Sequence, residues 1–169
     1  MNAESTIARN HQDTGGAEYL SFRLGDEGYG VDILKVQEIR GWEPVTRVPN
    51  APDYVRGVLN LRGAIVPVFD LRRRLGMEPV AYGKETVVIV VRVQGEEESK
   101  SIGLVVDAVS DVMRVTSDSI RATPEFGARL DTGLITGMVT AGERMVMLLD
   151  VEGLHQAQAA DPATEVGAA

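Results

Sequence analysis

The feature that most constrains the fold of this chain is an apolar segment that occurs twice, 80 residues apart (137 − 57 = 80). The first copy, Gly57–Leu71, consists of two apolar runs around a turn at Arg62-Gly63, and the second spans 137–151. Short apolar runs on either side of a glycine-containing turn are typical of β-hairpins. The sequence therefore predicts a duplicated hairpin.

The duplication extends upstream with a second spacing. Tyr29-Gly30-Val31 matches Ile102-Gly103-Leu104, 73 residues apart (103 − 30 = 73). Each half then runs as hairpin, irregular stretch, second hairpin and terminal aspartate, and roughly 60–70 residues per half are too few for a large separate core. A small closed barrel suits such a unit because closure leaves no exposed strand edge. We predict a mostly β fold of two barrels from approximate halves 18–80 and 84–155, packed together or exchanging a strand, with chance similarity between hairpins as the alternative.

Helices are expected to be few and short. Candidates lie at 71–75, where Asp70 would be the N-cap, at 117–120 and at 151–156. The terminal segments 1–17 and 156–169 are polar and rich in small residues, without an apolar period. They are expected to be disordered tails around an ordered domain at 18–155.

Composition excludes several classes of protein. The 169 residues include no cysteine, which removes disulfides, thiol catalysis and thiolate metal sites. The net charge of −8 argues against nucleic acid, whose phosphates require a basic face. No apolar run approaches the ~20 residues that cross a membrane, and the N-terminus lacks a signal-peptide core. We expect a cytoplasmic globule without nucleic-acid partners or direct membrane insertion.

Catalytic motifs are scarce. The two histidines, His11 and His155, lie in or beside the predicted tails, so neither is expected to act as a general base in a core pocket. No phosphate-binding glycine loop and no nucleophile elbow occur. Asp107 and Asp111 are spaced like turn and cap residues and lack a glycine-centred calcium loop. We expect a non-catalytic protein with no cofactor or metal, and a hydrolase using Asp107 or Asp111 is the alternative.

The remaining candidates are groups suited to binding. Arg62 lies at the hairpin tip, either as a solvated turn residue or as a presented guanidinium that could bind a carboxylate. Glu38 either points to water or pairs with Arg62 and fixes the tip. Arg121, Glu125 and Phe126 form a second cluster, in which Phe126 either plugs a barrel end or belongs to a small protein-binding patch.

Taken together, several segments resemble the CheW family of bacterial chemotaxis coupling proteins. The resemblance covers about 18–155, whereas the acidic 94–100 loop and the alanine-rich C-terminal tail depart from the family pattern. The segments that carry it are Leu24–Gly41, Gly57–Leu71 with its Asn-Leu-Arg-Gly turn, Gly103–Val112, Ile120–Phe126 and Gly142–Met145.

The resemblance implies two five-stranded, SH3-like barrels and no catalysis. It implies a scaffold that binds the cytoplasmic tip of transmembrane chemoreceptors and the regulatory domain of the histidine kinase CheA, monomeric in isolation and recruited to membrane-associated arrays. A paralogue serving a non-chemotaxis receptor-kinase system is the alternative. By resemblance, the receptor-binding residues are Val36, Glu38, Gly57, Arg62, Val105 and Val109, and the kinase and array contacts are Arg121, Glu125 and Phe126.

Overall fold

The computed structural model describes residues 16–94, 98–122 and 134–154, and within them the chain is mostly β. A helical turn at 151–154 follows the last strand. The elements are β1 (Ala17–Leu24), β2 (Glu27–Asp32), η1 (Ile33–Lys35), β3 (Val36–Gly41), β4 (Val55–Leu61), β5 (Ala64–Asp70), α2 (Leu71–Arg74), β6 (Val87–Gln94), β7 (Ser99–Val106), β8 (Ala108–Val115), η2 (Ser117–Ser119), β9 (Ile135–Ala141) and β10 (Arg144–Leu149).

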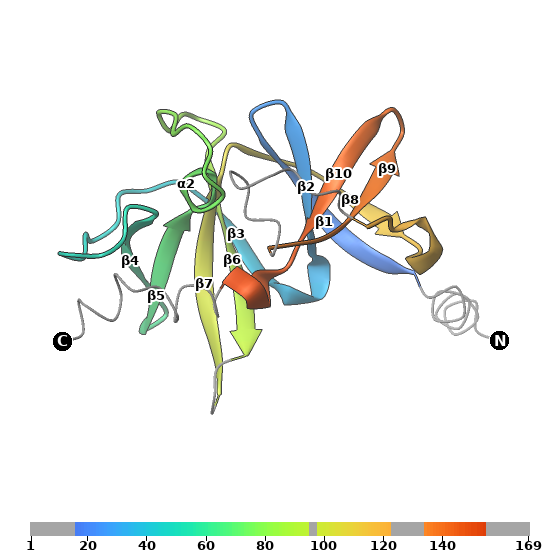
Figure 1. Cartoon of the computed structure of the whole chain (residues 1–169). Coiled ribbons are helices and arrows are strands. Elements are labelled where there is room, and N and C mark those ends of the chain that lie inside the picture. The colour runs from blue at the N-terminus through green and yellow to red at the C-terminus, as the bar shows by residue number, and fades with distance from the viewer. Residues whose placement is uncertain (1–15, 95–97, 123–133, 155–169) are drawn as a thin grey trace.

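The strands form two five-stranded sheets that lie side by side (Figure 1). Sheet A has the order β8-β1-β2-β10-β9, and sheet B has the order β3-β6-β7-β5-β4. Each sheet contains one parallel pair, β2 with β10 and β5 with β7, among antiparallel neighbours. The prediction of a mostly β fold with two five-stranded units and a few short helices is confirmed.

The sequence duplication reappears as identical strand pairing. Gly57 pairs with Val68 in the β4–β5 hairpin, and Gly137 pairs with Leu148 in the β9–β10 hairpin, 80 residues later at both positions. Val68 then lies beside Gly103 in the parallel pair of sheet B, as Leu148 lies beside Gly30 in sheet A. The two sequence spacings therefore describe one repeated architecture.

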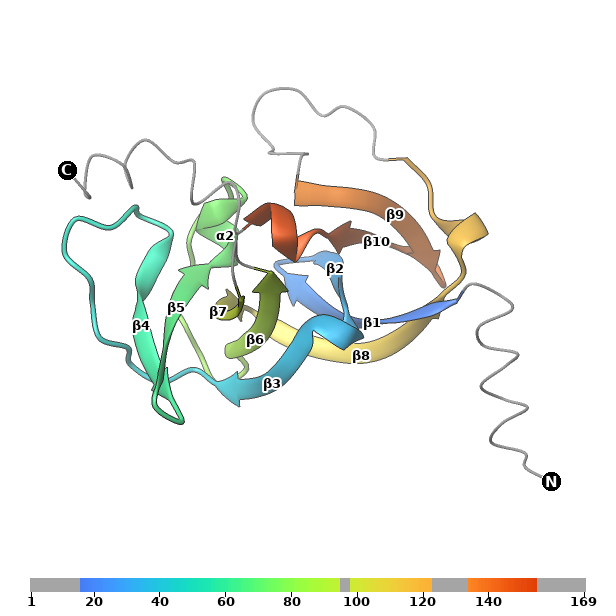
Figure 2. The ribbon, with the colours of Figure 1, turned by 90° about the horizontal axis from the view of Figure 1, so that it is seen from below.

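The two sheets do not coincide with the two halves of the sequence. Hairpin β1–β2 pairs with β8 and β10, strands from the second half, whereas hairpin β6–β7 pairs with β3 and β5, strands from the first. The chain consequently passes from sheet A to sheet B at η1 and back at Asp107, between β7 and β8 (Figure 2). The repeated units are thus interlocked.

Each sheet is closed by one isolated bridge. After β3 the chain turns back toward β4, where Thr46 and Val58 exchange two backbone hydrogen bonds of 3.0 and 2.8 Å. After β8 and η2, Arg121 and Met138 do the same at 2.8 and 2.9 Å. These bridges join the two outer strands of each sheet, which makes each sheet a small barrel.

The apolar core has three parts. The largest fills the space between the sheets and includes Phe22, Tyr29 and Leu104. A smaller cluster around Val68 and Val90 lies within sheet B, and another around Val146 and Leu148 lies within sheet A. The central cluster draws on both sheets, so the two barrels share most of their buried apolar surface.

Aspartates end the second hairpin of each repeat. The backbone N–H of Asp70 donates to the carbonyl of Tyr54 at 2.7 Å, and that of Asp150 donates to the carbonyl of Leu134 at 2.8 Å. The Asp70 carboxylate accepts from the Arg73 amide at 3.2 Å, which confirms its predicted role as the N-cap of α2. Short helical turns lie at 117–119 after β8 and at 151–154 after β10, where the sequence predicts short helices.

Several sequence predictions lie wholly or mostly outside the described residues. They concern the two tails, the two histidines, and part of the acidic 94–100 loop. Of the predicted N-terminal tail 1–17, only Gly16 and Ala17 are described, and Ala17 is the first residue of β1.

Candidate functional site

Glu38 and Arg62 meet at the outer face of sheet B. Nη1 of Arg62 lies 3.0 Å from Oε1 of Glu38, so of the two alternatives for Glu38 the ion pair is the one present. Arg40 lies on the other side of the same carboxylate, with its Nε 3.7 Å from Oε2. The Glu38 side chain is 23% exposed, whereas that of Arg62 is 78% exposed. The pair therefore orients a guanidinium that remains largely accessible to a partner.

The backbone at Arg62 is unusual for an arginine. Arg62 has a φ of +52° and Gly63 a φ of +88°, the arrangement of a type I′ hairpin turn. The Gly63 amide donates to the side-chain oxygen of Asn60 at 2.9 Å, which supports the turn. The repeat-related position, 62 + 80 = 142, is Gly142 with a φ of +66°. Glycine or asparagine normally occupies such positions, so the arginine here is at odds with local preference.

An open depression surrounds this ion pair. Leu34, whose exposed fraction is 88%, lies in η1 at its edge, and Val36 begins β3 within it. The remaining lining residues are Lys35, Gln37 and Arg92, together with Glu38 and Arg62. Leu34 and Arg92 were not named from the sequence, although a leucine beside the Asp32 cap of a short turn could have drawn attention. The site thus combines exposed apolar side chains with an oriented arginine.

The other predicted receptor-binding residues occupy different environments. Gly57 is buried with a φ of +148°, and a Cβ there would lie 2.2 Å from the carbonyl oxygen of Thr46. Val105 is 3% exposed within the core cluster of sheet B. Val109 is half-buried on β8 and, like Val36, packs against the central cluster between the sheets. The structure brings Val36, Glu38 and Arg62 together at one surface. Gly57 and Val105 are instead buried, on β4 and β7 of sheet B.

The second predicted cluster is described only in part. Arg121 is exposed and follows η2, where its backbone bridges to Met138 of sheet A. Glu125 and Phe126 lie outside the described residues.

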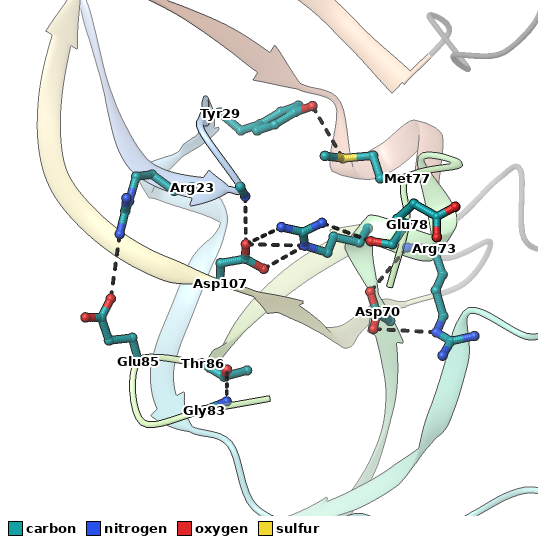
Figure 3. Close-up of polar contacts among 12 residues, drawn as sticks. Arg23, Tyr29, Asp70, Arg73, Met77, Glu78, Gly83, Glu85, Thr86 and Asp107 are labelled. Carbon is teal, nitrogen blue, oxygen red and sulfur yellow. Dashed lines mark hydrogen bonds and ion pairs between the residues drawn. The ribbon is translucent and has the colours of Figure 1, made fainter. Parts of the chain in front are cut away.

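Asp107, the candidate of the hydrolase alternative, is engaged in a structural contact. Its carboxylate accepts hydrogen bonds from Nε and Nη2 of Arg72 at 2.9 and 2.7 Å, and from the backbone of Gly25 at 2.6 Å (Figure 3). The Arg72 hydrogen bonds hold the pKa of Asp107 below its ordinary value, and the Gly25 amide acts in the same direction, against burial. A paired, ionised carboxylate of this kind is a poor general base.

Within 16–94, 98–122 and 134–154, no group of three or more acidic or histidine side chains could hold a metal ion. In the same ranges, none of the helices has the length and apolarity that crossing a membrane requires. The depression beside Glu38 and Arg62 contains three of the predicted receptor-binding residues, Val36, Glu38 and Arg62.

Comparison with known proteins gives concordant results. A family model described as the CheW-like domain matches residues 18–159. The chemotaxis protein CheW of Klebsiella aerogenes is 48% identical over 154 residues, which cover 91% of this chain and 90% of that protein. The probable chemotaxis protein CheW of Rhizobium etli is 43% identical over 140 residues, covering 83% and 88% of the two chains.

A solved structure also matches the fold. The crystal structure of the scaffolding protein TtCheW from Thermoanaerobacter tengcongensis aligns with a TM-score of 0.71 at 32% identity. The alignment covers 79% of this chain and 83% of that chain. Sequence and fold therefore point to the same family over nearly the whole described chain.

Proposed function

Because the chain belongs to the CheW-like domain family of non-catalytic chemotaxis scaffold proteins, we propose that it couples bacterial chemoreceptors to the histidine kinase CheA. In this role it binds the cytoplasmic tip of the receptor at one surface and the regulatory domain of the kinase at another. The protein is a monomer in isolation and takes part in a membrane-associated array once its partners are present.

The observation that carries the proposal is the arrangement around Arg62. A guanidinium at the tip of a rigid hairpin is held by Glu38 at 3.0 Å and remains 78% exposed. A planar guanidinium matches the geometry of a carboxylate, so an acidic side chain on the partner is the expected counterpart. The ion pair with Glu38 adds little stability at this exposure, about 0–1 kcal/mol. Its contribution is therefore to orientation.

The neighbouring apolar side chains suit a helical partner. Leu34 and Val36 lie in the same depression, and Val109 packs from sheet A against the central core that Val36 also contacts. An amphipathic helix binds by laying an apolar stripe on such side chains while its flanks meet polar groups. We assign the receptor contact to Leu34, Val36, Glu38, Arg62 and Val109. Gly57 and Val105 are buried and would act indirectly, by fixing the positions of β4 and β7 in sheet B.

The second surface is assigned to Arg121, Glu125 and Phe126. Arg121 lies at the closing bridge of sheet A, far along the chain and in the other sheet from Arg62. A scaffold that holds two partners at once needs separate surfaces, and contacts on separate sheets meet that need. Individually weak contacts suffice, because an array supplies avidity.

A reconstituted kinase assay tests the proposal. Receptor-containing membranes, CheA and this protein are combined, and kinase autophosphorylation is measured with and without the protein. We expect stimulation that falls again when attractant is added. Kinase activity no higher than that of receptor and kinase alone would sink the coupling function.

A further inference from the structure

The carboxylate of Glu152 joins three parts of the chain at the edge of the proposed receptor surface. Oε2 lies 2.7 Å from Nζ of Lys35 in η1, and Oε1 accepts the backbone N–H of Gln94 at 3.0 Å. Glu152 is the second residue of the helical turn after β10, where its own N–H donates to the carboxylate of Asp150 at 3.0 Å. One side chain from the end of sheet A thus holds both the crossover at η1 and the end of β6 in sheet B.

The position of η1 depends on such polar contacts. None of its three residues is buried, and only Ile33 packs partly against the central core. Caps at both ends also hold the turn, in which the Leu34 amide donates to the carboxylate of Asp32 at 2.9 Å and the Val36 amide donates to the Ile33 carbonyl. Leu34 and Val36 flank Lys35 in the sequence, so a shift of Lys35 displaces both contact side chains.

The repeat supplies a second contact of the same design at the other crossover. Position 72, which is 152 − 80, is Arg72 in α2, and it holds Asp107 where the chain returns from sheet B to sheet A. The backbone N–H of Gly25 completes this contact as that of Gln94 completes the first. The charges are reversed between the two pairs, because the residue after the hairpin is acidic in one (Glu152) and basic in the other (Arg72). Figure 1 shows α2 above strands β5 and β7 of sheet B, and the turn that follows β2 low in the view.

We infer that Glu152 is a positioning residue for the receptor-binding surface, acting through Lys35 on the turn that presents Leu34 and Val36. The inference rests on the proposed function. Each crossover is held by an ion pair from the turn that follows a hairpin, but only the Lys35–Glu152 pair adjoins the depression that contains Arg62. Removing either pair loosens a crossover, whereas only removal of the Lys35–Glu152 pair is expected to move Leu34 and Val36.

The test uses the full chain and two matched variants. Glu152→Gln removes one charge while it keeps an oxygen that can accept from Gln94. Asp107→Asn likewise removes the charge that pairs with Arg72 and keeps an oxygen that can accept from Gly25. The methyl signals of Leu34 and Val36 are followed by NMR in the free protein, and the affinity for a receptor cytoplasmic-tip fragment is measured by titration. Glu152→Gln is expected to shift both methyl signals and to weaken binding roughly threefold to tenfold. Asp107→Asn is expected to leave the Leu34 and Val36 methyl signals where they are in the unaltered protein.

A charge reversal separates positioning from loss of structure. Glu152→Lys alone places two ammonium groups together and should weaken binding further, while the double variant K35E/E152K restores the pair and should recover most of the affinity. Unmoved Leu34 and Val36 signals in Glu152→Gln, or a folded double variant that stays as weak as Glu152→Lys, would overturn the inference. If the unaltered protein fails to bind the tip fragment, the proposed function is refuted, and the methyl signals still decide whether Glu152 sets the turn.

Discussion

Replacing Arg62 with asparagine should make the protein more stable and less able to bind its receptor. An L-residue other than asparagine in the left-handed region costs roughly 1–2 kcal/mol, and Arg62 has a φ of +52°. Asparagine tolerates this conformation, and Asn-Gly is the preferred pair for a type I′ turn. Arg62→Asn therefore relieves backbone strain that the present sequence retains.

The magnitude follows from two opposing contributions. Loss of the ion pair with Glu38 costs about 0–1 kcal/mol, toward the lower end because Arg62 is 78% exposed. Relief of backbone strain returns about 1 kcal/mol or more, so the net gain is about 0.5–1 kcal/mol. For a chain of this size, that gain corresponds to a rise in melting temperature of about 1–4 °C. Receptor binding should weaken roughly tenfold, because a charge-assisted contact is lost.

The measurement pairs calorimetry with titration of the receptor tip fragment. Gly142→Arg is the matched control, since Gly142 occupies the equivalent place in the β9–β10 hairpin with a φ of +66° and open space around it. It should lower the free energy of unfolding by about 1 kcal/mol and leave tip binding unchanged. A fall in stability for Arg62→Asn of about 1 kcal/mol or more, or tip binding as tight as before, would refute the reasoning.

Two further predictions concern the fold that supports the site. Gly57→Ala should lower the free energy of unfolding by about 3 kcal/mol or more in urea titrations, because its Cβ would lie 2.2 Å from the Thr46 carbonyl oxygen; a loss below about 1 kcal/mol would contradict this. Asp107 has a pKa below its ordinary value of 3.8, so its contact with Arg72 stabilises the fold above that pH and the contribution is lost as pH falls through the lowered pKa. The difference in unfolding free energy between the unaltered protein and Asp107→Asn should therefore be complete at neutral pH and shrink below about pH 4; a constant difference down to pH 2 would argue against it.

Much of the architecture could be predicted because the local patterns are strong. The Arg62-Gly63 turn, the Asp70 cap and both sequence spacings of the repeat correspond to strand pairs and hydrogen bonds in the structure. Each of these features depends on residues close together in the chain or on a match between two similar segments. Periodicity and turn chemistry report such local features directly.

The partner of each hairpin could not be predicted in the same way. Hairpins β1–β2 and β6–β7 have equivalent patterns, so periodicity does not distinguish pairing within a half from exchange between halves. The contacts that accompany the exchange join distant residues, Lys35 with Glu152 and Arg72 with Asp107. Such pairs carry no local signal, because each residue alone resembles a solvated charge.

Burial within the site was equally hard to predict. The resemblance places Val105 among the receptor-binding residues, but β7 runs between two neighbours through the interior of sheet B and leaves that side chain 3% exposed. Leu34 has the opposite character, a large apolar side chain 88% exposed in a short turn. Both belong to apolar stretches of sequence, and only the arrangement of the sheets distinguishes them.

The exchange of hairpins has a mechanical consequence for a protein that stands between two partners. Two barrels joined by a single linker could tilt against each other, so a movement of one barrel would bend the linker and leave the other barrel in place. Here each barrel contains a two-stranded hairpin from the other half of the sequence. An ion pair holds each of the two segments that connect the barrels. If a helix binds sheet B as proposed, its displacement of that sheet should also move sheet A, so that the two proposed binding surfaces move together.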